Sequence, residues 1–164
     1  MFKHILLAID DSPSGSAAIS HAIAMAGDAG AVHVIHVNEF AVGGRGHTLE
    51  TRKEAAAVLE TALADLRTAG VSASGVVVTS TCFNVARRIT DEAHSWPADV
   101  IVVGSRRRSR LGGLRGKGMR ERITGLTSLP VMTSPPPLRL DRRGPEAQSR
   151  SALRGAPVRT PVGF

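Results

Sequence analysis

The sequence has one cysteine, no tyrosine, and only 3% aromatic residues in 164. Because Cys82 is alone, the chain has no internal disulfide and is unlike the disulfide-rich secreted domains. So few rings leave no stacking platform for single-stranded nucleic acid. No apolar run approaches the roughly 20 residues of a membrane span, and the apolar run at the start is too short for a secretion signal. These absences predict a cytoplasmic protein with no membrane partner.

Positive charge is concentrated in two segments, although the chain as a whole has a formal net charge of +7. Residues 104–122 hold eight basic residues and one acidic, and residues 135–164 hold six arginines and two acidic residues. The rest of the chain has seven basic and eleven acidic residues. A concentrated field of this kind attracts phosphates or polyanions, and a solvated surface segment is the alternative interpretation. No recognition-helix motif is present, so we expect no sequence-specific nucleic acid.

Strand and helix patterns alternate up to residue 134, which predicts an α/β fold with a parallel sheet. Ser12 followed by Pro13 is a typical helix start, and the predicted helices lie between compact apolar runs. Prolines 135–137 end regular structure, and residues 135–164 are rich in Arg, Pro, Gly and Ser. We therefore predict one domain over residues 1–134 and a disordered tail over 135–164. The predicted strands are 4–9, 31–37, 75–80, 98–105 and 129–134. The predicted helices begin at Pro13 after the cap Ser12, at Thr48 and near Val85, and the last one covers roughly 118–127.

Several of these segments carry a family resemblance. They are the opening strand with Asp10 and Ser12, the strand that ends in His36-Val37, the segment ADVIVVGSR, and the closing RERI…LPV. Over about residues 3–134 the chain resembles the universal stress protein family. The resemblance implies a single doubly wound, Rossmann-like domain with a five-stranded parallel sheet and helices on both faces. It also implies a homodimer that pairs through strand 129–134, and a site for ATP or ADP.

The resemblance further implies which residues form that site. Asp10, at the end of the first strand, would hold the ribose, and Val37 would offer backbone groups to the adenine. Asp10 has an alternative role as a cap of the first helix. At Gly104 the missing side chain would let the backbone approach the phosphates. The implied cofactor-binding residues are Ala8, Ile9, Asp10, Val37, Val103, Gly104, Arg107, Lys117, Gly118 and Met119.

The phosphate motif of the family is altered in this chain. Family members typically show a glycine, two residues, a second glycine, nine residues, and then Gly-Ser or Gly-Thr. Here Gly104 matches the first glycine, Arg107 replaces the second, and Lys117-Gly118 replaces the final pair. The motif is therefore degenerate, and a cation in place of a backbone donor binds phosphate with looser geometry. In a shifted alignment, the amides come instead from Gly112, Gly113 and Gly116.

No set of nucleophile, base and orienting group is evident, so we predict that the protein is not an enzyme, with at most slow incidental ATP hydrolysis. No metal is predicted, because His33 and His36 lie three apart on a strand and point to opposite faces. The leading hypothesis is a dimeric nucleotide-binding regulator of the stress response. The alternatives are a dimeric interaction scaffold without a ligand, and a polyanion-binding module that uses residues 106–122.

Overall fold

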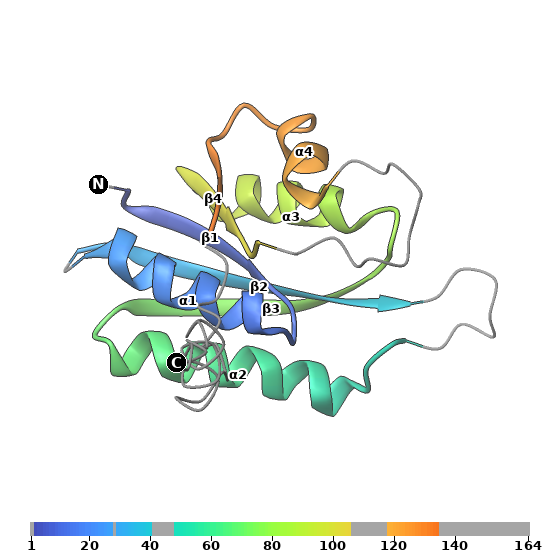
Figure 1. The fold of residues 1–164 in the computed structure, drawn as a ribbon, viewed down its shortest axis with the longest axis horizontal. Coiled ribbons are helices and arrows are strands. Elements are labelled where there is room, and N and C mark those ends of the chain that lie inside the picture. The colour runs from blue at the N-terminus through green and yellow to red at the C-terminus, as the bar shows by residue number, and fades with distance from the viewer. Residues whose placement is uncertain (1, 28, 41–47, 106–117, 135–164) are drawn as a thin grey trace, which may run out of the picture.

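The computed structural model describes residues 2–27, 29–40, 48–105 and 118–134. Within these ranges strands and helices alternate (Figure 1). The basic residues 106–117 and the predicted tail 135–164 lie outside the described residues. No helix in the described ranges is long and apolar enough to cross a membrane. The elements are β1 (His4–Ile9), α1 (Pro13–Ala26), β2 (Ala31–Phe40), α2 (Arg52–Thr68), β3 (Ser72–Thr81), α3 (Val85–Ser95), β4 (Val100–Val103), α4 (Met119–Thr124) and β5 (Val131–Thr133).

The strands form one parallel sheet in the order β3-β2-β1-β4-β5, which confirms the predicted fold class. The chain first builds the sheet outward from β1 to β3 and then returns to add β4 on the other side of β1. This reversal leaves a crevice outside the carboxyl ends of β1 and β4, the place where open α/β sheets usually bind ligands.

Two apolar cores lie on opposite faces of the sheet. Helices α1 and α2 cover one face, where Leu7, Val34 and Leu63 are buried in a common cluster. Helices α3 and α4 cover the other, where Leu6 and Ile35 pack with residues of both helices. All four residues of β4 are buried, as expected for a central strand covered on both sides.

Element boundaries differ from the sequence prediction where side-chain caps or strand pairing decide them. Strand β2 extends to Phe40 because its last residues pair with β3, up to Thr81. Helix α2 begins later than the predicted Thr48, because Thr51 and Glu54 form a capping box there. Helix α4 and strand β5 are shorter than predicted.

The first turn of α1 packs tightly against the end of β1. Ser12 caps the helix by accepting from the Gly15 amide, and Pro13 is its first residue, as predicted. A Cβ on Gly15 would meet the carbonyl oxygen of Asp10 well inside the 3.0 Å that real Cβ contacts essentially never go below. Only glycine therefore lets the helix start this close to the strand end.

Candidate functional site

A cleft opens at the carboxyl ends of β1, β2 and β4, on the face of the sheet that α3 and α4 cover. We call it the switch-point cleft. Its cavity volume is about 100 Å³, below the roughly 300–1,000 Å³ typical of small-molecule sites. A nucleotide in it would therefore extend beyond it along the sheet edge. Its lining residues are Ala8, Ile9, Asp10, Ser14, Ile35, Val37, Glu39, Val85, Ile89, Val103, Gly104 and Met119.

The structure brings most of the predicted site residues together here. Gly118 directly precedes the lining residue Met119 but is itself exposed and does not line the cleft. Arg107 and Lys117 lie outside the described residues. The predicted residues that do line the cleft are Ala8, Ile9, Asp10, Val37, Val103, Gly104 and Met119.

Five lining residues were not predicted. Ile35 and Glu39 lie two residues before and after Val37 on β2, so strand alternation places all three on one face. That spacing could have identified them. Val85 and Ile89 are four apart on α3, a spacing that is typical of any helix face that packs on a core. The fifth, Ser14, reaches the cleft because α1 starts so close to β1.

The walls of the cleft are mostly aliphatic, with polar groups at Asp10, Ser14 and Glu39. Aliphatic walls suit the faces of a flat ring, whereas carboxylates accept hydrogen bonds from hydroxyl and amino groups. Among the described lining residues there is no histidine, cysteine or lysine. The described lining therefore includes none of the usual general bases other than carboxylates.

Asp10 is oriented by the helix cap. The Ser12 hydroxyl donates to Oδ1 of Asp10, while the same serine caps α1. The alternative interpretation of Asp10 as the cap residue is therefore wrong, because the shorter serine side chain takes that position. Asp10 instead buttresses the cap from the strand end.

Gly104 allows α1 to pack closely against the end of β4. A Cβ at this position would lie 3.0 Å from the Ser14 carbonyl oxygen and 3.2 Å from its carbonyl carbon. The Ser14 hydroxyl also donates to the Ser105 carbonyl at 2.9 Å. The glycine thus brings the end of β4 against the first turn of α1, a structural reason that holds without any phosphate.

At the start of α4, the first backbone amide already has a carboxylate as its hydrogen-bond acceptor. The Gly118 amide donates to Oε2 of Glu121 at 2.8 Å. Two nearby arginines bind carbonyl oxygens: Arg120 Nε donates to Val131 at 3.4 Å, and Arg122 Nη2 donates to Cys82 at 3.2 Å and also to Phe83. Within the predicted polyanion segment 106–122, the described arginines are therefore used in part to hold the backbone.

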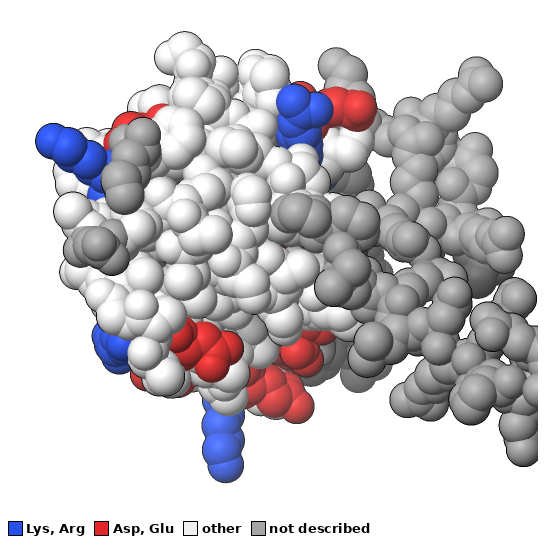
Figure 2. Space-filling view, turned by 60° about the vertical axis from the view of Figure 1, so that its left-hand side comes forward, with Lys and Arg blue, Asp and Glu red and all other residues white. Residues whose placement is uncertain are grey.

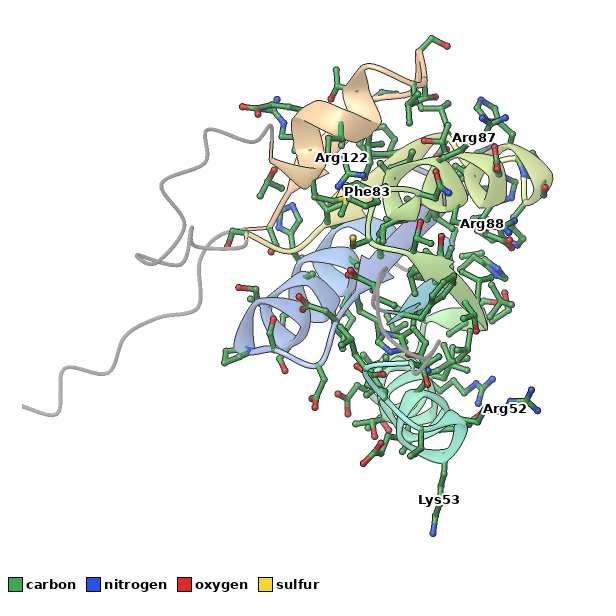
Figure 3. The ribbon with its side chains drawn as sticks, turned by 90° about the vertical axis from the view of Figure 1, so that its right-hand side faces the viewer. Arg52, Lys53, Phe83, Arg87, Arg88 and Arg122 are labelled. Carbon is green, nitrogen blue, oxygen red and sulfur yellow. The ribbon has the colours of Figure 1, made fainter. Side chains whose placement is uncertain are left out.

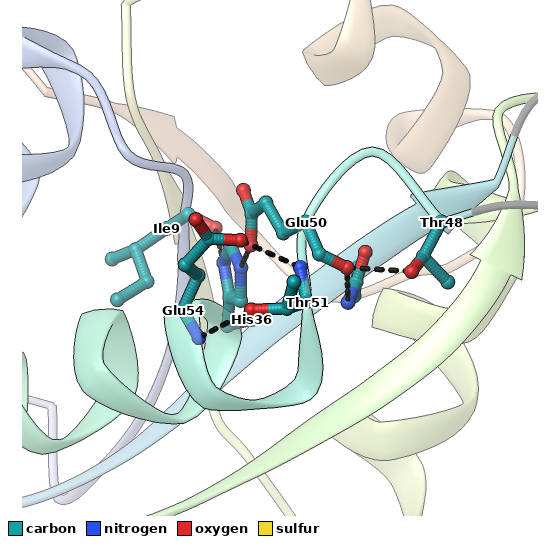
Figure 4. A network of polar contacts seen from close by, with 7 residues as sticks. Ile9, His36, Thr48, Glu50, Thr51 and Glu54 are labelled. Atoms are coloured by element: carbon teal, nitrogen blue, oxygen red, sulfur yellow. Dashed lines mark hydrogen bonds and ion pairs between the residues drawn. The ribbon is translucent and has the colours of Figure 1, made fainter.

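A polar network on the opposite face fixes the strand ends (Figure 4). His36 is 2% exposed, and its Nδ1 donates to the Ile9 carbonyl at 3.1 Å. Its Nε2 lies 2.7 Å from Oε2 of Glu50. Just beyond, the Thr51 amide donates to Glu54 at 2.7 Å, and this hydrogen bond and the one from the Thr51 hydroxyl lower the pKa of the Glu54 carboxyl. His36 thereby ties the end of β1 to β2 and to the segment that leads into α2.

The two strand histidines face opposite sides of the sheet, as predicted. His33 stacks on Trp96, with ring centroids 5.1 Å apart, and its Nε2 lies 2.9 Å from Glu92 of α3. His36 faces the α2 side instead. No group of three or more His, Cys, Asp or Glu side chains within the described ranges could hold a metal ion.

A larger hollow of about 510 Å³ lies between the start of α1 and α2. Its lining includes five carboxylate residues, so phosphate groups would be repelled from it. Figure 2 shows one face of the molecule, on which much of the described surface is uncharged and acidic side chains gather along the lower edge. The switch-point cleft is therefore the better candidate for a nucleotide. The five carboxylates are Asp10, Asp11, Glu50, Glu54 and Asp65.

Comparison with known proteins gives one family. Residues 1–135 match the model of the universal stress protein family. A universal stress protein family member from Burkholderia pseudomallei is 25% identical, with a TM-score of 0.64 over 81% of this chain and 96% of that one. The Archaeoglobus fulgidus universal stress protein in complex with dAMP is 21% identical, with a TM-score of 0.59 over 81% and 98% of the two chains. A universal stress protein in complex with cAMP is 15% identical, with a TM-score of 0.60 over 80% and 95%. No curated protein sequence matches the chain significantly.

Proposed function

The chain belongs to the universal stress protein family, and we propose that its switch-point cleft binds an adenine nucleotide as a regulatory ligand in the stress response. The observation that carries the proposal is the convergence of the ends of β1, β2 and β4 on one cleft with Asp10, Val37 and Gly104 in its lining. Two solved relatives are described as complexes with dAMP and cAMP, which supports an AMP-type ligand.

The charges of the cleft favour one orientation of the ligand. Asp10 and Glu39 are carboxylates, so a neutral base and ribose fit between them better than phosphate oxygens do. The phosphates would leave the cleft past Gly104, toward the start of α4. Every phosphate that reaches the Gly118 amide must displace the Glu121 carboxylate. We therefore expect AMP or ADP to lose little affinity relative to ATP.

We infer that the nucleotide acts by shifting a conformational equilibrium and is not turned over. The described lining offers no histidine, cysteine or lysine, and its two carboxylates, Asp10 and Glu39, lie where we expect the base and ribose and not the phosphates. A ligand of this kind regulates only through a difference in its affinity for two states. The cytoplasmic location indicated by the sequence stays a prediction.

We further propose a homodimer in which β5 of one copy pairs with β5 of another. Strand β5 lies at one edge of the sheet. The Ser134 amide donates to the Val103 carbonyl, and the Ile101 amide donates to the Pro130 carbonyl. The backbone N–H and C=O groups of the alternate residues Val131 and Thr133 therefore point away from β4, toward the open edge of the sheet. Exposed edges of this kind are templates for strand pairing.

Nucleotide binding can be tested with a substitution that fills the cleft. Ala8 is partly buried and lines it, so Ala8→Leu inserts a larger aliphatic side chain where the ligand would lie. At an AMP or ADP concentration of 100 times Kd, the free energy of unfolding of the native protein should rise by about 2.7 kcal/mol. That is a rise in Tm of about 5–11 °C, which Ala8→Leu should abolish. Differential scanning fluorimetry measures the shift and isothermal titration calorimetry measures Kd.

The matched control is Ala57→Leu, the same change at an exposed residue in the acidic hollow. It should leave the ligand-induced shift unchanged. An absence of any shift in the native protein at millimolar nucleotide would contradict the proposal, as would an equal loss of binding in both variants.

A further inference from the structure

A second hollow, separate from the switch-point cleft, lies between the start of α3 and α4. We call it the Phe83 groove; its volume is about 400 Å³, and its lining includes Phe83, Asn84, Arg87, Glu121, Arg122 and Leu126. Phe83 is 73% exposed and Leu126 is 52% exposed. Two of the three large exposed hydrophobic residues in the described part of the chain therefore line one groove. A single exposed hydrophobic side chain is ordinary, but two together indicate a surface for a partner.

The groove is basic, although the described part of the chain has eight Lys and Arg residues against eleven Asp and Glu. Figure 3 shows Phe83 and Arg122 close together where α3 begins, with Arg87 farther along α3. Arg122 is half-buried and is held in place by its bonds to the Cys82 and Phe83 carbonyls. A guanidinium has five donor hydrogens, so these contacts leave others for a partner. The acidic member of the groove, Glu121, is bound to the Gly118 amide.

The start of α3 adds to the positive charge of the groove. Asn84 makes no side-chain cap bond, and the first turn holds no acidic residue. The partial positive charge of the helix N-terminus therefore adds to that of the two arginines. Apolar anchors flanked by arginine are typical of surfaces that recognise proteins, where exposed aromatic and Arg residues supply most of the binding energy.

We propose that the Phe83 groove docks an acidic segment of another protein that inserts an apolar side chain between Phe83 and Leu126 and places a carboxylate beside Arg87 and Arg122. Charge complementarity selects this occupant. The tail of this chain, residues 135–164, has six arginines against two acidic residues and would be repelled. The proposal does not rest on nucleotide binding, because the groove and the cleft share no lining residue.

Peptide selection tests the proposal. A display library of random 12-residue peptides is selected on the full chain, and the selected peptides are then tested for binding to the double variant Phe83→Ser, Arg87→Glu. Both side chains are exposed, so the variant should fold, and its circular dichroism and Tm verify this. The selected peptides should combine Asp or Glu with a large apolar residue. In fluorescence polarisation, their affinity should fall at least tenfold in either single variant and should weaken as salt rises.

Two matched controls separate the groove from general surface effects. Leu49→Ser removes the third exposed hydrophobic residue, which is 72% exposed and lies elsewhere. Arg88→Glu reverses a charge next to Arg87 that does not line the groove. Both should keep the native affinity. The proposal is overturned if the selected peptides are not acidic, or if they bind the double variant as well as the native chain. It is also overturned if Phe83→Ser converts a dimer into a monomer in sedimentation, because the occupant would then be a second copy.

Discussion

The close approach of α1 to the end of β1 gives the sharpest test of the cleft geometry. We predict that Gly15→Ala destabilises the protein even though alanine is the better helix former. In an open helix the change would gain about 1 kcal/mol. Here the new Cβ overlaps the Asp10 carbonyl oxygen and also lies 3.4 Å from its carbonyl carbon and Oδ1. A Cβ cannot rotate away from a backbone atom, so α1 or the strand end must move.

Overpacking of this kind costs about 1–3 kcal/mol, and a rigid backbone contact belongs in the upper half of that range. After the gain in helix propensity, the net loss in the free energy of unfolding is about 1–2 kcal/mol. At roughly 2–4 °C per kcal/mol, Tm should fall by about 2–8 °C. Urea denaturation with an unchanged m-value would show that stability alone has changed.

Gly125→Ala is the matched control. Gly125 has φ −75°, and a Cβ at this position would lie 3.6 Å from the nearest carbonyl oxygens, an ordinary contact. Alanine should therefore stabilise by about 0.4–1 kcal/mol through the unfolded state. Equal stability of Gly15→Ala and the native protein would refute the packing described for α1, and with it the placement of Asp10 in the cleft.

Three further predictions concern the sheet edge, the start of α4 and the start of α2. Thr133→Pro removes an outward amide from β5 and should convert the proposed dimer to a monomer in size-exclusion chromatography with light scattering; a dimer that persists would exclude pairing through β5. Glu121→Gln removes the carboxylate charge at Gly118 and should raise the affinity for ATP more than that for AMP in calorimetry; an equal change for both would place the phosphates elsewhere. Because hydrogen bonds lower the pKa of Glu54 from 4.5, its contribution to stability is present above that value and is lost as pH falls through the lower folded value. The protection factor of the Thr51 amide against hydrogen exchange, which is its rate relative to an unstructured amide at the same pH, should then fall at low pH. Glu54→Gln should remove that dependence; a pH profile of the protection factor unchanged by the substitution would show that another group is responsible.

The fold was predictable because each buried strand is a compact apolar run with turn residues after it. The run ending in Asp10 and the run ending in Gly104 had to become neighbouring parallel strands for their ends to share a cleft, and the strand order places them so. Helix bounds were less predictable. The start of α2 depends on the reciprocal bonds of Thr51 and Glu54, and Thr48 is an equally good cap by residue type.

For the candidate site, sequence identified the strand-end residues and missed those that helix packing supplies. In the sequence, Val85 and Ile89 look like any core-facing pair. Only the tertiary structure shows that the N-terminal half of α3 faces a cleft. Gly104 was interpreted through phosphate approach, whereas its close contact with Ser14 is a packing feature that no local pattern reveals. The carboxylate of Glu121 on Gly118 likewise depends on where α4 begins.

A crystal structure of the full chain grown with ADP tests the central claim most directly. The account predicts electron density for the base and ribose in the switch-point cleft, with the ribose hydroxyls beside Asp10 and the phosphates leaving past Gly104. Density for the nucleotide in the acidic hollow between α1 and α2, or an empty cleft at millimolar ADP, would contradict it.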